Sequence, residues 1–268
     1  MRSSLVLAAL GALVLSGCAR MAITGSADID RTAFGAKKRY AVVSISSMKT
    51  FHGEKGLTQL FTDTDDIPGA NSQPLIDALH PRIIAALQSN KNFTLLPEQK
   101  VLASKAYKGM AEDARVFKVM FTSDDINVAG KYKYFSDPAK LAQLAKTLGV
   151  DGVITVSMGF SVVSSKGGVS VNGLSFGSKS YSSMATITAL AYDRKGKVVW
   201  KDSTVKEAEP GDKKAVVVLD TSDITKTDFR KMHPSAIEIG AKAVTVLMAR
   251  FDDTMAGKEV SSMQRIKD

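Results

Sequence analysis

The sequence predicts an α/β fold: a mixed central sheet flanked by helices, with a C-terminal β-hairpin and a final helix. Strand-like and helix-like stretches alternate through the first half of the chain, which favours a sheet with helices packed on it. The clearest hairpin signal is the pair of β stretches at 181–193 and 197–201, separated by the turn 193–196 with its glycine. A helical pattern at 236–251 follows near the end of the sequence.

The first elements are expected to be a strand at 39–46 and a helix that begins after Ser72. The helix is indicated by apolar residues that recur at helical spacing: Ile76, Leu79, Ile83 and Leu87. Pro81 lies inside this pattern and should kink the helix or restart it. A short strand at 93–96 and a helix at 97–105 follow.

The later elements carry clearer boundary signals. A helix at 138–148 is preceded by the capping residue Asp137 and ended by Gly149. A strand at 153–157 comes directly after it. Ser235 and Glu238 form a capping-box pattern at the start of the final helix, at 236–251.

Two long segments interrupt this order and are read as insertions in a single domain at 38–268. The segment near 47–72 is expected to be a loop with an acidic cluster at 63–66. The segment near 108–137 combines a possible helix at 111–120 with the aromatic residues Tyr132, Tyr134 and Phe135. These aromatic residues fit either an exposed contact surface or a partly buried insertion.

The N-terminus has the layout of a secretory signal peptide at 1–17. Arg2 supplies a positive charge, residues 5–15 are apolar, and Ser16 and Gly17 are small. The apolar run is shorter than the roughly 20 residues that a membrane-spanning helix needs. The segment is therefore expected to be removed on export.

The four residues Leu15-Ser16-Gly17-Cys18 resemble the lipobox of bacterial lipoproteins. The resemblance implies that Cys18 becomes the acylated N-terminus and holds the protein on a membrane, with residues 18–37 as a lipidated tether. Two or more acyl chains anchor a protein firmly. Ala19 stands where an aspartate often retains such proteins at the inner membrane, so the resemblance favours the outer membrane, facing the periplasm.

The body of the chain resembles the periplasmic α/β domain of the curli-secretion channel lipoproteins and of the amino-terminal domain of the Tol-system translocation protein. The resemblance rests on the element order and on the stretches 141–154 and 193–200. It implies a periplasmic domain without a channel, because residues 160–180 are rich in Ser and Gly and lack the paired alternating strands of a membrane pore.

No pattern in the sequence predicts a catalytic, cofactor or metal site. Cys18 is the sole cysteine, and His52, His80 and His233 do not stand at metal-ligand spacing. The stretch 173–180 departs from a phosphate loop at Ser178, and the acidic cluster departs from a calcium loop at Pro68. The net charge of +9 is scattered, which fits either a solvated surface or contact with anionic envelope components and does not indicate nucleic-acid binding.

These observations predict a non-catalytic envelope lipoprotein that acts as a binding or assembly module in secretion or envelope maintenance. Its expected partners are the membrane, through Cys18, and an envelope protein that contacts 47–72 or 108–137. Assembly of the chain into a homo-oligomer is a further alternative. Two other functions also stay open: an envelope hydrolase with an unrecognised site, and an oligomeric pore component built from β extensions at 160–180.

Overall fold

The computed structural model describes most of the chain from residue 22 onward. The described residues are 22–23, 27–53, 67–119, 122–165, 169–171, 174–176, 180–208, 216–219, 227–260 and 263–264.

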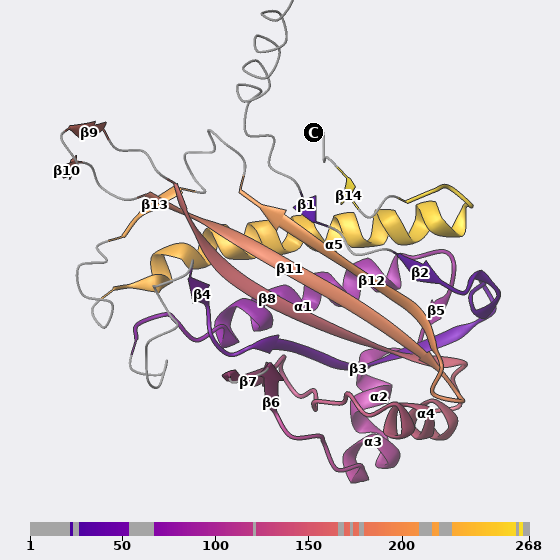
Figure 1. Cartoon of the computed structure of the whole chain (residues 1–268). Coiled ribbons are helices and arrows are strands. Elements are labelled where there is room, and N and C mark those ends of the chain that lie inside the picture. The colour runs from indigo at the N-terminus through magenta and orange to yellow at the C-terminus, as the bar shows by residue number, and fades with distance from the viewer. Residues whose placement is uncertain are drawn as a thin grey trace, which may run out of the picture.

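A mixed β-sheet forms the centre of the protein (Figure 1), with the strand order β2-β12-β11-β8-β3-β7-β6. Strand β3 runs parallel to β8, whereas β8, β11 and β12 are antiparallel neighbours. The strands of this path are β2 (Asp28–Ile29), β3 (Arg39–Met48), β6 (Val116–Val119), β7 (Thr122–Val128), β8 (Gly152–Ser165), β11 (Ser180–Asp193) and β12 (Val198–Glu207).

Short strands complete the set. Strands β4 (His52–Gly53), β5 (Thr94–Leu95) and β13 (Val216–Val218) pair with β8, β3 and β11 respectively. Two small antiparallel pairs lie outside the main sheet: β1 (Ala22–Ile23) with β14 (Met263–Gln264), and β9 (Val169–Val171) with β10 (Leu174–Phe176).

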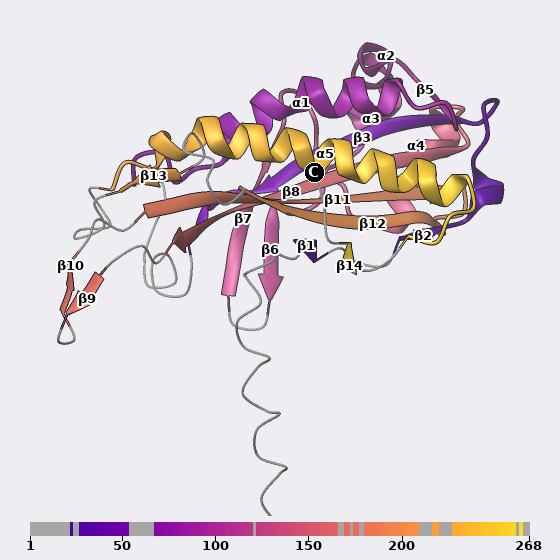
Figure 2. The same ribbon diagram turned by 90° about the horizontal axis from the view of Figure 1, so that it is seen from above.

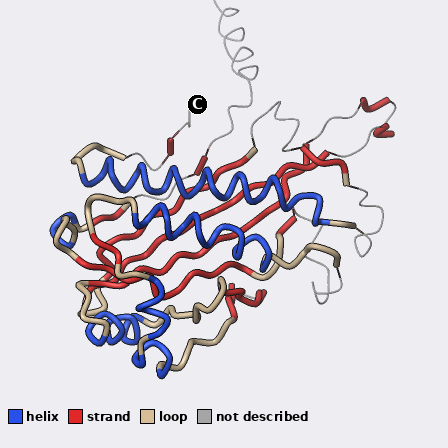
Figure 3. The backbone as a smooth tube through the Cα atoms, turned by 180° about the vertical axis from the view of Figure 1, so that it is seen from behind, coloured by secondary structure: helices blue, strands red, loops and turns tan. Residues whose placement is uncertain are grey.

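Two long helices cover one face of the sheet. Helices α1 (Gln73–Gln88) and α5 (His233–Met255) lie side by side on that face (Figures 2 and 3). Three shorter helices, α2 (Glu98–Ala103), α3 (Lys105–Gly109) and α4 (Pro138–Thr147), gather at the end of the sheet where β3 and β8 begin. The β6–β7 hairpin projects from the face opposite α1 and α5, as Figure 2 shows. Neither of the two long described helices lies on that opposite face.

The core between the sheet and α5 is built around aromatic rings. The ring of Phe251 on α5 packs against Trp200 on β12, with 4.7 Å between centroids, and against Phe34 and Phe93 at 5.1 and 5.7 Å. Tyr40 on β3 stacks on Phe34 at 4.8 Å. All five side chains are buried, so this cluster joins β3, β12 and α5 in one apolar unit.

An ion pair is buried in the same layer. The Arg250 guanidinium donates two hydrogen bonds of 2.9 Å from Nε and Nη2 to the two carboxylate oxygens of Asp202. The side chains of Arg250 and Asp202 are 2% and 0% exposed. Burial raises the pKa of the Asp202 carboxyl, and the bonds from Arg250 act in the opposite direction.

Strand β3 contains a bulge. Val42 lies opposite Ile154 of β8 and Ser44 lies opposite Thr155, so Val43 is an extra residue between them. The hydroxyl of Tyr107 donates a 3.0 Å hydrogen bond to the carbonyl oxygen of Val43. This contact holds the bulged residue from the side of α3.

The structure confirms the predicted fold class and most of the predicted elements. The hairpin is formed by β11 and β12, and Gly196 adopts a φ of +82° in its turn. Helix α4 begins where expected, because the Asp137 carboxylate accepts a 2.8 Å bond from the N–H of Ala139, and Gly149 follows it with a φ of +66°. Strand β8 is much longer than the predicted 153–157.

The predicted helix at 111–120 is wrong, because residues 111–115 are irregular and residues 116–119 form strand β6 of the β6–β7 hairpin. Val116 and Val119 are β-branched residues that favour strands, and pairing of β7 with β3 decides the local structure. The predicted helix at 97–105 is broken into α2 and α3. Ser104 separates them, and its hydroxyl accepts a 3.1 Å bond from the N–H of Tyr107 at the start of α3.

Two predicted helix starts differ from the structure, and the alternative that Pro81 restarts the first helix is wrong. Ser72 precedes α1, but its hydroxyl bonds to the carbonyl of Met48 and to Ser47 instead of capping the helix. Helix α1 continues through Pro81 without restarting. The capping box at Ser235 is absent from the observed helix start, because α5 already begins at His233.

The described part of the expected tether contacts the domain. Strand β2 pairs with β12, and a short 3-10 helix, Arg31–Ala33, follows it. Phe34 is 6% exposed within the aromatic cluster. Residues 28–34 therefore pack as part of the domain surface and core.

Candidate functional site

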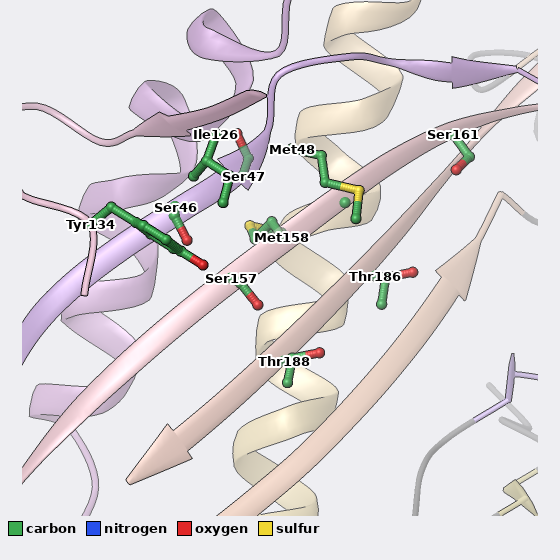
Figure 4. A pocket seen from close by; sticks show the side chains of 11 residues that line it. Ser46, Ser47, Met48, Ile126, Tyr134, Ser157, Met158, Ser161, Thr186 and Thr188 are labelled. Carbon is green, nitrogen blue, oxygen red and sulfur yellow. The ribbon is translucent and has the colours of Figure 1, made fainter. Parts of the chain in front are cut away.

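A pocket of about 410 Å³ lies on the face of the sheet opposite α1 and α5 (Figure 4). This volume is in the range of small-molecule sites, about 300–1,000 Å³. Strands β3, β7, β8 and β11 and the segment before α4 form its walls. The lining residues are Ser46, Ser47, Met48, Ile126, Tyr134, Ser157, Met158, Gly159, Ser161, Thr186 and Thr188.

The alternation of side chains along each strand explains why the pocket is rich in hydroxyl groups. Successive side chains of a strand point to opposite faces of the sheet. On β8, the buried residues Val156, Met158 and Phe160 alternate with Ser157, Gly159 and Ser161, which lie on the pocket face. The same alternation on β11 places Thr186 and Thr188 on that face.

Strand register aligns three of these hydroxyl residues in a row across the sheet with a fourth, Ser203, outside the pocket. Ser46 of β3 lies opposite Ser157 of β8, Ser157 lies opposite Thr188 of β11, and Thr188 lies opposite Ser203 of β12. Neighbouring strands are about 4.8 Å apart. We call Ser46, Ser157, Thr188 and Ser203 the hydroxyl row; its first three members line the pocket, and the row continues beyond it.

Most pocket hydroxyls have no partner within the part of the chain that the structure describes. Thr188 and Ser203 share a 2.9 Å hydrogen bond. The hydroxyls of Ser46, Ser157, Ser161, Thr186 and Tyr134 form no hydrogen bond with any described residue. They are therefore available as both donors and acceptors to a ligand.

The lining is uncharged. Among the described residues that line the pocket there is no Asp, Glu, Lys, Arg or His, and Tyr134 is the one titratable group. Side chains of this kind hold a neutral ligand by hydrogen bonds and apolar contact. They do not supply a general acid or base near neutral pH or a strong metal ligand.

Tyr134 is positioned by contacts of the segment that precedes α4. Its carbonyl oxygen accepts a 2.9 Å bond from the N–H of Asp113, and the N–H of Phe135 donates to Ser44 Oγ at 3.4 Å. The Asp113 carboxylate in turn accepts bonds from the N–H groups of Ser136 and Asp137, at 2.7 and 2.9 Å, and from the Lys140 ammonium. Burial alone would raise the pKa of Asp113, but Lys140 and these N–H groups lower it to about 2.

Replacing Asp113 with asparagine is expected to lower the free energy of unfolding by about 2 kcal/mol at pH 7, since hydrogen bonds to a charged group are lost. A carboxyl whose pKa is lowered by folding stabilises the protein above its unfolded pKa, and this contribution disappears as the pH falls through the folded value. The difference between wild type and D113N should therefore shrink between about pH 4 and pH 2. Urea unfolding at several pH values, followed by circular dichroism, measures it, and a difference that does not change with pH would contradict the assignment.

A second pocket, of about 480 Å³, lies between α1, α2 and the turn at Gly130. His80 Nε2 and Glu98 Oε1 are 2.6 Å apart there, and the His80 ring packs edge-on against Tyr132 at 5.5 Å. Burial raises the pKa of the Tyr132 hydroxyl, and the nearby Glu98 charge raises it further. Lys108 and Lys131 also line this pocket.

The His80–Glu98 pair has the geometry by which a carboxylate orients an imidazole, as in hydrolase triads. A triad also needs a nucleophile within hydrogen-bond reach of the histidine. The described lining of this pocket contains no serine, threonine or cysteine. In the structure the pair connects the middle of α1 to the start of α2.

The other residues considered from the sequence do not meet at one site. His233 bonds to the carbonyl oxygen of Gly69 at 2.9 Å, and the backbone of His52 belongs to β4. Cys18, the acidic cluster at 63–66 and half of the stretch 173–180, namely residues 173 and 177–179, lie outside the described residues. Within the described chain, no group of three His, Cys, Asp or Glu side chains is arranged to bind a metal ion.

None of the described helices has the length and apolar character needed to span a bilayer.

The insertion at 108–137 is partly buried. Tyr132 and Phe135 are each 2% exposed, so the three aromatic residues do not form an exposed surface. Tyr134 is half-buried and lines the pocket. Of the loop at 47–72, the structure describes residues 47–53 and 67–72, and Met48 lies in the pocket wall.

Sequence reasoning missed the hydroxyl-lined pocket. The signal was present in the pattern Ser-x-Gly-x-Ser at 157–161 and in Thr186 and Thr188, where small polar residues alternate with apolar ones on two strands. It becomes specific only when the register places these strands next to each other and next to Ser46.

No protein-family model and no curated protein matches this sequence. Among solved structures, the chain is similar to the C-terminal domain of LpoB from Salmonella enterica, with 13% identity and a TM-score of 0.32 over 65% of this chain and 85% of that chain. It is also similar to a neuraminyllactose-binding hemagglutinin homolog from Helicobacter pylori, with 8% identity and a TM-score of 0.40 over 83% of this chain and 88% of that chain.

Proposed function

We propose that this chain is a lipid-anchored envelope lipoprotein that faces the periplasm from the outer membrane and acts as a non-catalytic binding or assembly module. In this proposal residues 1–17 are removed, Cys18 is acylated, and the residues after it connect the anchor to the domain. The lipobox resemblance at residues 15–18 supports the anchor. Anchoring confines the domain to a surface, which raises its effective concentration for partners on the same membrane.

The observation that carries the binding role is the pocket on the uncovered sheet face, with five hydroxyls that have no partner among the described residues. A pocket lined in this way supports recognition of a ligand and offers no acid–base pair for chemistry. The β6–β7 hairpin projects beside it, since Ile126 of β7 lines the pocket. Val116 on β6 is 38% exposed, which supports this hairpin as a contact region for a protein partner.

Replacing Cys18 with serine is expected to abolish lipid attachment and release the protein from the membrane. The modified sulfur is then missing, while a conservative exchange at a position outside the described residues should leave the stability of the described domain unchanged. Metabolic labelling with radioactive palmitate and fractionation of the two membranes measure both effects. The lipid-anchor proposal fails if the wild type incorporates no label or if the C18S variant stays membrane-bound and labelled.

The partner proposal is tested with a photo-crosslinking amino acid at Val116 in the anchored protein. The matched control carries the same amino acid at Glu238, an exposed position on α5 at the opposite face. We expect a reproducible adduct when the crosslinker stands at position 116. The adduct should be absent when the crosslinker stands at position 238, and absent from the variant at position 116 that also carries C18S. Equal adducts at both positions, or none at Val116, would refute a contact through this hairpin.

An envelope hydrolase is the second candidate, because the His80–Glu98 pair lies in a pocket. Serine- or cysteine-type hydrolysis there requires a nucleophile that the described lining does not contain. The tethered binding module therefore accounts for more of the observed geometry.

A further inference from the structure

We infer that the ligand of the pocket on the sheet face is a neutral glycan chain. This inference rests on the proposed binding role and names the chemical class that the lining selects. Three properties of the described lining carry it: its lack of charge, its free hydroxyls and the spacing of the hydroxyl row.

The lack of charge excludes ionic ligands as the preferred class. Phosphate, carboxylate and ammonium groups are bound through charge-assisted hydrogen bonds from Arg, Lys, Asp or Glu. No such side chain occurs among the described residues that line this pocket. A charged ligand would lose its hydration there without gaining a counter-charge.

The free hydroxyls exclude a purely apolar ligand. Ser46 is 4% exposed, yet its hydroxyl has no partner among the described residues and lies at the pocket. An acyl chain would cover this hydroxyl and those of Ser157 and Thr186 and leave them without hydrogen bonds, which costs free energy. Sugar hydroxyls both donate and accept, so they match these groups in either direction.

The spacing of the hydroxyl row fits a glycan chain laid across the sheet. Ser46, Ser157 and Thr188 lie on successive strands, about 4.8 Å apart across the sheet. This is close to the length by which one pyranose ring advances a β-linked chain. Each pyranose ring carries hydroxyls on both of its edges, so successive rings can each meet a member of the hydroxyl row.

The remaining lining suits the apolar faces of sugar rings. Met48, Ile126 and the ring of Tyr134 stand beside the hydroxyls, and Figure 4 shows Tyr134 next to Ser46 and Ser157. Gly159 leaves the floor open, because a Cβ built there would find Thr186 Cβ as its nearest neighbour, at 4.0 Å. A side chain at position 159 would therefore enter the pocket without displacing the core.

The test is calorimetric titration of the full acylated protein in lipid nanodiscs with chitotetraose, a neutral β-linked tetrasaccharide. Wild type should bind it, and Gly159→Leu should weaken binding at least about tenfold by filling the pocket. The double variant Ser157→Ala/Thr186→Val should also weaken binding about tenfold, since two hydrogen bonds are lost. Lys201→Leu is the matched control, because Lys201 lies on the same face on β12 but does not line the pocket.

The comparison ligands decide between classes. Tetraglucuronate, a neutral tetrapeptide and the uncharged apolar ligand 1-hexanol should each bind more weakly than chitotetraose. The inference is overturned if any of them binds as tightly, if chitotetraose does not bind, or if Gly159→Leu binds it like wild type. Urea unfolding of each variant verifies that it is folded. Crosslinking from Val116 does not depend on position 159, so it reports separately on the proposed partner-binding role.

Discussion

Replacing Arg250 with methionine is expected to lower the free energy of unfolding by about 3–5 kcal/mol, the usual cost of leaving one charge of a buried pair without its partner. Methionine keeps much of the side-chain volume but removes both hydrogen bonds to Asp202. The carboxylate would remain in a site where it is 0% exposed. Urea unfolding followed by circular dichroism measures the loss.

An exposed pair on the same protein supplies the control. Arg230 bonds to Asp228 with similar geometry, but its side chain is 67% exposed. Exposed ion pairs contribute about 0–1 kcal/mol, so Arg230→Met should have little effect. The double variant Asp202→Leu/Arg250→Met should recover much of the loss, because neither charge is then buried alone. Equal effects of R250M and R230M would show that burial does not govern the Arg250 contribution.

The R250M loss should also depend on pH. Burial raises the pKa of Asp202, and without the opposing bonds from Arg250 this effect is unbalanced. A carboxyl with a raised folded pKa stabilises the protein below its unfolded pKa and loses that contribution as the pH rises. R250M should therefore be closest to wild type in acid and furthest from it near neutral pH.

Replacing Phe251 with alanine is expected to cost about 3–5 kcal/mol. Phe251 is 0% exposed and contacts the rings of Phe34, Phe93 and Trp200, so its removal leaves a cavity at the point where three elements meet. The same unfolding measurement applies. Trp200 is the sole tryptophan, and its emission should move to longer wavelength in folded F251A as its surroundings become less tightly packed.

Two further variants test whether packing is the cause. Phe251→Leu fills part of the space and should cost clearly less than the alanine variant. Val198→Ala truncates a residue of β12 that is 39% exposed and should change stability by less than about 0.5 kcal/mol. A similar loss for F251A and V198A would contradict the role given to the aromatic cluster.

The elements that sequence predicted best are those specified by local signals. Asp137 and Gly149 mark the two ends of α4, and the turn before Lys197 marks the β11–β12 hairpin. The β6–β7 hairpin was missed because its pairing with β3 depends on residues about 80 positions away. The Ser235 capping pattern failed because packing of the preceding 3-10 helix, Phe229–Met232, moves the start of α5 to His233.

The pocket could not be predicted because it depends on several strands at once. Each hydroxyl on β8 and β11 fits an ordinary half-exposed strand when considered by itself. The site arises when β3 lies parallel to β8 in a register that places Ser46 opposite Ser157, and when Asp113 holds the segment that carries Tyr134. Neither condition is encoded by a short motif.

The bulge at Val43 decides which side chains of β3 face the pocket. Before the bulge, even-numbered residues such as Tyr40 and Val42 face the helices; after it, Ile45 and Ser47 do. In a strand without the bulge, side chains would alternate regularly along β3. Ile45 would then face the pocket and Ser46 would face the core. The hydrogen bond from the Tyr107 hydroxyl to the Val43 carbonyl oxygen therefore stabilises the register of the whole strand. With the extra residue held in place from α3, apolar side chains stay in the core and hydroxyl side chains stay on the opposite face of the sheet.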